Sequence, residues 1–134
     1  TGIMNNPGSV CDIYNNLVIK SMSAGIFVQG NGGNRIYNNV VIQPGQAQDA
    51  KGDGIVISKG TNQGNSILLW NNTVIQPGRH GITFRNNEGS NNLIQDNMII
   101  GPVGIQGDQP AAYINADPEE ITIVDNFTAE AIPD

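Results

Sequence analysis

Charge and long apolar segments are scarce in this sequence, and each scarcity excludes a class of protein. Charged residues make up 13% of the 134 residues, the 12 acidic side chains outnumber the 6 basic ones, and the basic residues never cluster. This balance argues against nucleic acid as a partner. The longest apolar runs reach only four residues, as at 67–70, whereas a helix needs roughly 20 to cross a bilayer. We therefore expect neither nucleic acid binding nor membrane insertion.

Cysteine and histidine are equally scarce. Cys11 and His80 are the only residues of their types, so the chain has no disulfide framework and no cluster with the spacing of a metal site. We expect no metal and no cofactor.

Glycine and asparagine, in contrast, are abundant. The chain has 17 glycines and 19 asparagines and otherwise favours isoleucine and valine. Glycine and asparagine accept positive φ at low cost, so this mixture is typical of short β-strands joined by tight turns. The length suits one domain, residues 1–134, with a single core.

The sequence repeats. A first motif places apolar residues on both sides of an Asn-Asn or Asp-Asn pair, and successive copies lie 23, 33, 25 and 29 residues apart. Its copies are residues 13–19, 36–42, 69–75, 94–100 and a degenerate 123–128. A second motif, Gly-Ile, alternates with the first and occurs at residues 2–3, 25–26, 54–55, 81–82 and 104–105. The largest insertion between copies is residues 43–53.

Each repeat contains three short segments in which apolar and polar residues alternate: one after Gly-Ile, one before the asparagine pair and one after it. Alternation is the pattern of a strand with one buried face. Three short strands cannot close a core alone, but repeats stacked as turns of one coil bury their inward faces together.

These motifs resemble the right-handed parallel β-helix superfamily, which includes pectate lyases, polygalacturonases, alginate epimerases and phage tailspikes. The resemblance covers roughly residues 2–128 and is greatest to carbohydrate-binding and sugar-hydrolysing β-helix repeats. It implies an all-β fold, a right-handed single-stranded parallel β-helix of about five coils. It also implies an asparagine ladder, because the second asparagine of the pair stacks from coil to coil in that family. The ladder residues are Asn16, Asn39, Asn72, Asn97 and Asn126, and we expect them to accept the positive φ of their turn.

In that family the strand after Gly-Ile forms the floor of a substrate-binding groove. Alternation predicts that Ile3, Ile26, Ile55, Ile82 and Ile105 face inward and that Met4, Phe27, Val56, Thr83 and Gln106 face outward, with Gln29, Ser58 and Arg85 two residues further on. The outward positions hold no carboxylate, which argues against a polygalacturonase-type hydrolase and a calcium-dependent lyase. Met4, Phe27 and Val56 form an apolar stripe that either the 43–53 insertion covers or a partner does.

Residues able to do chemistry lie mostly in the turns beside this groove. The candidates for substrate binding are Lys51, Asp53, Arg79, His80 and Arg85, and the candidates for catalysis are Lys59, Arg79, His80 and Arg85. A β-eliminating lyase needs a base and a cation, and Lys59 with Arg85, or His80 with Arg79, would provide both. The similarity to chondroitinase B and alginate lyases is faint, and strand register aligns Lys59 with Asn86. Catalysis, sugar contact and a purely structural role all remain open, as do sugar stacking and surface packing for Trp70.

The resemblance favours a polysaccharide-engaging segment of a secreted or cell-surface carbohydrate-active protein, with an acidic polysaccharide as its partner. The alternatives are a lyase or epimerase acting on uronate polymers, and a non-catalytic structural or adhesive module; whether the chain is an enzyme stays open. Because the chain begins inside a repeat, we expect it to be the C-terminal part of a longer β-helix. Upstream coils or a second copy would then cover its N-terminal face.

Overall fold

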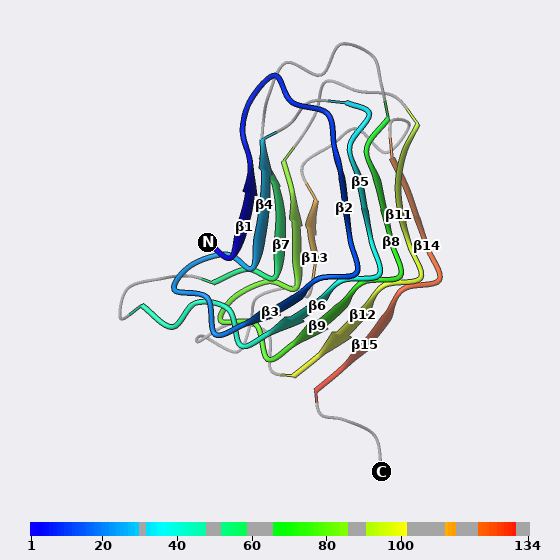
Figure 1. Cartoon of the computed structure of the whole chain (residues 1–134). Helices are drawn as coiled ribbons and strands as arrows, with labels where there is room; N and C mark the ends of the chain where they lie inside the picture. The colour runs from blue at the N-terminus through cyan, green and yellow to red at the C-terminus, as the bar shows by residue number, and fades with distance from the viewer. Residues whose placement is uncertain are drawn as a thin grey trace.

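The computed structural model describes residues 1–29, 32–47, 52–58, 66–85, 91–101, 112–114 and 121–130. Within these ranges the chain forms short β-strands and no helix. Every third strand joins the same sheet, and neighbouring strands are parallel, so the chain winds through three five-stranded sheets in turn (Figure 1). The fold is a parallel β-helix, which confirms the expected fold class.

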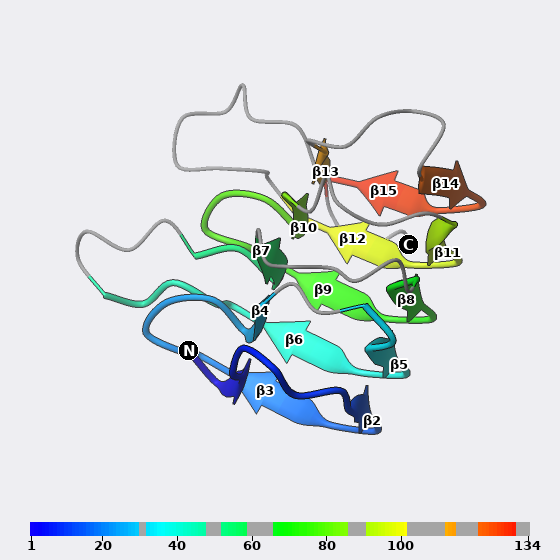
Figure 2. The same ribbon diagram turned by 90° about the horizontal axis from the view of Figure 1, so that it is seen from above.

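One strand from each sheet makes one coil. Sheet A contains β1 (Ile3–Asn5), β4 (Ile26–Gln29), β7 (Ile55–Ser58), β10 (Ile82–Phe84) and β13 (Ala112–Ile114). Sheet B contains β2 (Asp12–Tyr14), β5 (Arg35–Tyr37), β8 (Leu68–Trp70), β11 (Asn92–Gln95) and β14 (Ile121–Val124). Sheet C contains β3 (Leu17–Ile19), β6 (Val40–Ile42), β9 (Thr73–Ile75), β12 (Met98–Ile100) and β15 (Phe127–Ala129). Figure 2 shows the strands of sheet C side by side in this order.

The core is built from equivalent residues of successive coils. In sheet A, Ile26, Ile55 and Ile82 are in register and at most 1% exposed. In the first four coils, inward residues of the other two sheets join the same hydrophobic cluster, among them Ile36, Leu69, Val41 and Val74. Strand alternation therefore predicts the inward face correctly at these positions.

The glycine of the Gly-Ile motif is required by close packing between coils. A Cβ atom on Gly54 would collide with the backbone oxygen of Gly81 and with Cγ1 of Val74, which reaches across the core from sheet C. A Cβ on Gly81 would lie 2.6 Å from three side-chain carbons of Ile99. The motif thus marks where neighbouring coils leave no room for a side chain.

The asparagine ladder is present. Asn16 Nδ2 donates to Asn39 Oδ1 at 3.0 Å, and the Nδ2 atoms of Asn39, Asn72 and Asn97 each donate to the next residue of the ladder at 2.9 Å. Each accepting oxygen also receives a backbone N–H from the preceding coil. Asn39, Asn72 and Asn97 are at most 2% exposed, so these bonds stabilise the coil stack from inside.

One expectation about the ladder is wrong. The positive φ of this turn belongs to the residue before each ladder asparagine, with φ between 53° and 56° at Asn15, Asn38, Asn71, Asp96 and Asp125. The reason is that the two residues of the pair have different roles. The first residue turns the backbone, and the turn orients the side chain of the second residue along the stack of coils. A second turn, after sheet C, has positive φ at Lys20, Gln43, Gln76 and Gly101.

The fifth strand of sheet A is also not where the Gly-Ile motif predicts it. Ala112 of β13, rather than Ile105, pairs with Ile82 of β10. The expected positions of Ile105 and Gln106 lie outside the described residues. Residues 101–111 connect β12 to β13, whereas residues 20–25 connect β3 to β4 and residues 76–81 connect β9 to β10. The last Gly-Ile motif, at residues 104–105, therefore falls within the connection and not at the start of the strand.

A second set of buried asparagines lies between sheets A and B. Asn34 Oδ1 accepts hydrogen bonds from Asn5 Nδ2 and from the backbone N–H of Cys11, both at 2.9 Å. Asn92 Oδ1 accepts the backbone N–H of Ile67 at 2.9 Å. Sequence analysis missed these residues, although Asn34 and Asn92 each lie five positions before a ladder asparagine, and that spacing was the available signal.

Candidate functional site

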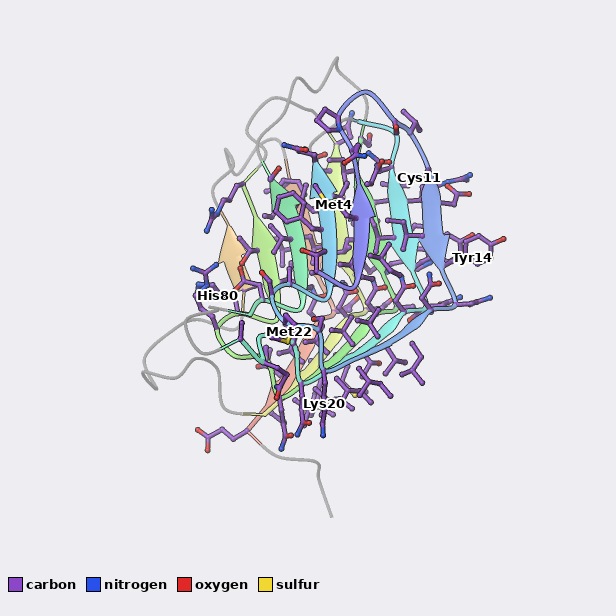
Figure 3. All side chains as sticks on the ribbon, turned by 60° about the vertical axis from the view of Figure 1, so that its left-hand side comes forward. Met4, Cys11, Tyr14, Lys20, Met22 and His80 are labelled. Atoms are coloured by element: carbon purple, nitrogen blue, oxygen red, sulfur yellow. The ribbon has the colours of Figure 1, made fainter. Side chains whose placement is uncertain are left out.

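Three of the predicted site residues meet in one cluster beside sheet A. Asp53 precedes β7, and Arg79 and His80 precede β10 one coil later. Arg79 Nε donates to Asp53 Oδ1 at 2.7 Å and Arg79 Nη2 donates to Oδ2 at 2.6 Å. The backbone N–H of His80 donates to Asp53 Oδ1 at 3.1 Å. Figure 3 shows His80 at this edge of the fold.

Thr83, which sequence analysis placed on the outer face of sheet A, completes the cluster. Its hydroxyl donates to Asp53 Oδ2 at 2.8 Å, and the residue is fully buried. The sequence did contain a signal for this contact. Asp53 directly precedes Gly-Ile in one repeat, and Thr83 directly follows Gly-Ile in the next, so the strand register places Thr83 one coil beyond the Asp53 carboxylate.

Burial and hydrogen bonding oppose each other at Asp53. Burial alone raises the pKa of this carboxyl, because desolvation disfavours the charged form. The bonds from Arg79, the His80 backbone and Thr83, with the charge of Arg79, outweigh burial and hold the pKa below its ordinary value of 3.8. The same pairing raises the pKa of Arg79. Asp53 is therefore a buried carboxylate with both oxygens engaged, which ties two coils together.

The remaining candidates are placed differently. Arg85 is exposed and follows β10, in one row with Gln29 and Ser58, which confirms the register expected for these three residues. It lies at the opposite end of β10 from Arg79 and His80. Lys51 and Lys59 lie outside the described residues, so the pairing of Lys59 with Arg85 stays a prediction.

The three residues of the predicted apolar stripe on sheet A differ in how far their side chains are exposed. Met4 is 56% exposed, Phe27 is half-buried, and Val56 is 7% exposed; Met4 lies forward on the sheet in Figure 3. The 43–53 insertion is one of the two covers considered for this stripe, and its residues 48–51 lie outside the described part of the chain. The insertion does pack closely where it is described, because a Cβ on Gly52 would collide with the backbone of Pro44 and Gly45.

A second candidate surface lies on the outer face of sheet B. Tyr14, Tyr37 and Trp70 are in register on successive coils, and their rings stack. Tyr14 and Tyr37 have ring centroids 5.0 Å apart and planes 2° apart; the values for Tyr37 and Trp70 are 4.4 Å and 9°. Tyr14 is 49% exposed and points away from the core (Figure 3). Sequence analysis considered Trp70 alone and missed the column.

An ion pair lies next to this aromatic column. Arg35 Nε donates to Asp12 Oδ1 at 2.7 Å and Arg35 Nη2 donates to Oδ2 at 2.6 Å. These bonds raise the pKa of Arg35, whose side chain is 54% exposed. The outer face of sheet B therefore presents the edges of three stacked aromatic rings beside a charged, hydrogen-bonded pair.

Among the residues that the structure describes, no three His, Cys, Asp or Glu side chains are grouped so that they could hold a metal ion. No helix in those ranges is long and apolar enough to span a membrane. Comparisons with protein-family models, curated proteins and solved structures found no match to this chain. The geometry establishes the class, a parallel β-helix with an internal asparagine ladder, and goes no further.

Proposed function

We propose that this chain is a polysaccharide-engaging β-helix segment of a secreted or cell-surface carbohydrate-active protein, related to the pectate-lyase-like superfamily. The observation that carries the proposal is the outward column of Tyr14, Tyr37 and Trp70 beside the Asp12–Arg35 pair. Sugars have apolar C–H groups and polar hydroxyls, and the outward edges of the stacked rings can contact the first while the polar tips of tyrosine and tryptophan hydrogen-bond the second.

The column also matches an extended ligand. Coils repeat at about 4.8 Å along the axis, so a glycan chain lying along sheet B would meet one aromatic edge in each of three coils. Arg35 and Asp12 neutralise each other, but the guanidinium keeps N–H groups beyond the two that Asp12 accepts, and these can donate to the carboxylates of an acidic polymer.

The proposal is for binding because the carboxylate of Asp53 is already bonded to Arg79, His80 and Thr83. A general base must be free to take a proton from the substrate, and a carboxylate with a lowered pKa and both oxygens engaged is a weak one. The lyase alternative would rest on Lys59 with Arg85, or on the buried His80 with Arg79, whose guanidinium is bonded to Asp53.

The test uses the fluorescence of Trp70, the chain's single tryptophan. Uronate polymers and matched neutral polymers are titrated into the protein while emission is followed. We expect a saturable change with the acidic polymers, about tenfold weaker binding for Tyr14→Ala, and weaker binding in high salt.

Arg85→Ala is the matched control, because Arg85 lies on sheet A. If Arg85→Ala abolishes binding and Tyr14→Ala leaves it unchanged, the binding site lies on sheet A and not on sheet B. Absorbance from an unsaturated sugar product would establish the lyase alternative. If no polymer binds, the proposal is wrong and the structural or adhesive module is favoured.

A further inference from the structure

Sheet C has an apolar outer face. The outward positions are the first and third residues of each of its five strands, and nine of these ten are hydrophobic, the exception being Thr73. Leu17 is 63% exposed, Ile19 55%, Phe127 46% and Met98 40%. A contiguous exposed apolar patch of this kind marks an interaction surface.

The area of this face suits a second β-sheet. Its exposed fractions amount to roughly 500 Å² per chain, so two copies packed face to face would bury about 1,000 Å², the least area that a specific interface is expected to bury. The third coil contributes Thr73 and Ile75 at the centre of the face. Sheets that pack in this way lie about 10 Å apart with their strands nearly aligned.

In the part of the chain that the structure describes, charges on this face lie only at its two rims. Along the rim that follows the strands, Lys20 stands in the first coil and Glu130 in the last. Along the rim that precedes the strands, Asp96 and Asp125 stand in the fourth and fifth coils, and Asn15 and Asn38 hold the equivalent places in the first two. Figure 3 shows Lys20 extending from this side of the molecule.

A two-fold symmetric pair of these faces has two possible orientations. With the coil order parallel and the strands reversed, Asp125 of each chain would lie opposite Glu130 of the other, which is repulsive. With the coil order antiparallel, Lys20 lies opposite Glu130 and Asp125 lies opposite Asn15, so each symmetric half gains an attractive pair and no repulsive one.

We propose that two copies of this chain associate through the outer faces of sheet C, with their coils antiparallel and Lys20 of each copy beside Glu130 of the other. The inference is independent of the proposed sugar site, which lies on sheet B. In this arrangement Ile75 sits at the two-fold axis and contacts Ile75 of the second copy.

Sedimentation velocity across a wide concentration range tests the association. We expect a concentration-dependent dimer for the unmodified chain. Ile75→Asp should abolish it, because two carboxylates would meet at the axis. Leu68→Asp is the matched control, since Leu68 is a half-buried outward residue of sheet B in the same coil, and its dimer should persist. A chain that stays monomeric, or a dimer that Ile75→Asp leaves intact, would overturn the proposal.

Charge reversal tests the orientation. Lys20→Glu and Glu130→Lys should each weaken the dimer about tenfold, and the double variant K20E/E130K should restore it. These positions are exposed, so the variants should fold even if Ile75→Asp does not. If the double variant dimerises no more tightly than the single variants, the antiparallel arrangement is excluded. A carbodiimide cross-link between Lys20 and Glu130 of differently labelled chains should form in the unmodified protein, and its absence would also count against this arrangement.

Discussion

Asn71 and Asn72 are adjacent residues with different structural roles in the same turn. Asn71 is exposed and holds a positive φ of 53°. Asn72 is 1% exposed, and its Nδ2 donates to Asn97 Oδ1, to the Trp70 carbonyl and to the Ile36 carbonyl. Its Oδ1 accepts from Asn39. The stability of the coil stack therefore depends on the second residue of the pair far more than on the first.

Replacing Asn72 by leucine should lower the free energy of unfolding by at least about 3 kcal/mol, because several buried donors and acceptors lose their partners together. Urea denaturation followed by circular dichroism measures this loss. Asn71→Gly is the matched control: glycine accepts positive φ readily, so the change should cost well under about 1 kcal/mol. A larger loss for Asn71→Gly than for Asn72→Leu would mean that the two roles are reversed.

The glycines of the Gly-Ile motif lead to a prediction about compensating changes. Gly81→Ala would place its Cβ against Ile99 alone among the nearest atoms, whereas Gly54→Ala meets the backbone oxygen of Gly81 as well as Val74. Overpacking of this kind costs about 1–3 kcal/mol. Adding Ile99→Ala should therefore relieve Gly81→Ala, while adding Val74→Ala should relieve Gly54→Ala much less.

Double-mutant cycles measure this difference. The cycle of Gly81→Ala with Ile99→Ala should give a favourable coupling energy of about 1 kcal/mol or more. The cycle of Gly54→Ala with Val74→Ala should give a smaller one. Equal coupling energies in the two cycles would show that the backbone of the next coil can move to make room for a Cβ atom. That result would contradict the tight spacing between coils described above.

The sequence predicted the fold well because the repeat constrains it many times over. Each inward isoleucine and each ladder asparagine recurs at the same place in its coil, so a single misread copy does not change the architecture. The prediction erred in the last coil. After β12 the Gly-Ile motif no longer marks the strand, and only the register of Ala112 with Ile82 shows which residues take its place.

The candidate site was predicted less well, for a physical reason. Sequence analysis placed Asp53, Arg79 and His80 together but could not determine whether the cluster is open to solvent. The decisive residue is Thr83, because its hydroxyl binds the second oxygen of Asp53 and the cluster becomes a closed network. The aromatic column was missed because Tyr14, Tyr37 and Trp70 lie far apart in sequence and only the coil register aligns them.

Thr83→Val tests the hydrogen bond from the Thr83 hydroxyl to Asp53. Valine has nearly the shape of threonine without its hydroxyl, so the packing of β10 is retained and only the 2.8 Å bond to Asp53 Oδ2 is lost. The free energy of unfolding at neutral pH should fall by about 1–3 kcal/mol, the range for a hydrogen bond to a charged group. Ser58→Ala, a half-buried change on the same sheet, should cost less. Equal losses would mean that the hydroxyl of Thr83 does not stabilise the carboxylate.

The pH dependence of stability tests the charge of Asp53. Its pKa is lower in the folded chain than its ordinary value of 3.8, so above that value the unfolded state binds no more protons than the folded one, and the full stabilisation is present. As the pH falls from about 4 toward 2, the unfolded state takes up the proton first, and this contribution is lost. Asp53→Asn leaves Arg79 without its carboxylate and should cost about 2–4 kcal/mol at neutral pH. The variant should also lose less stability than the unmodified chain between pH 4 and 2, as measured by urea denaturation at each pH. Parallel pH profiles for the two proteins would show that the folded chain does not lower the pKa of Asp53.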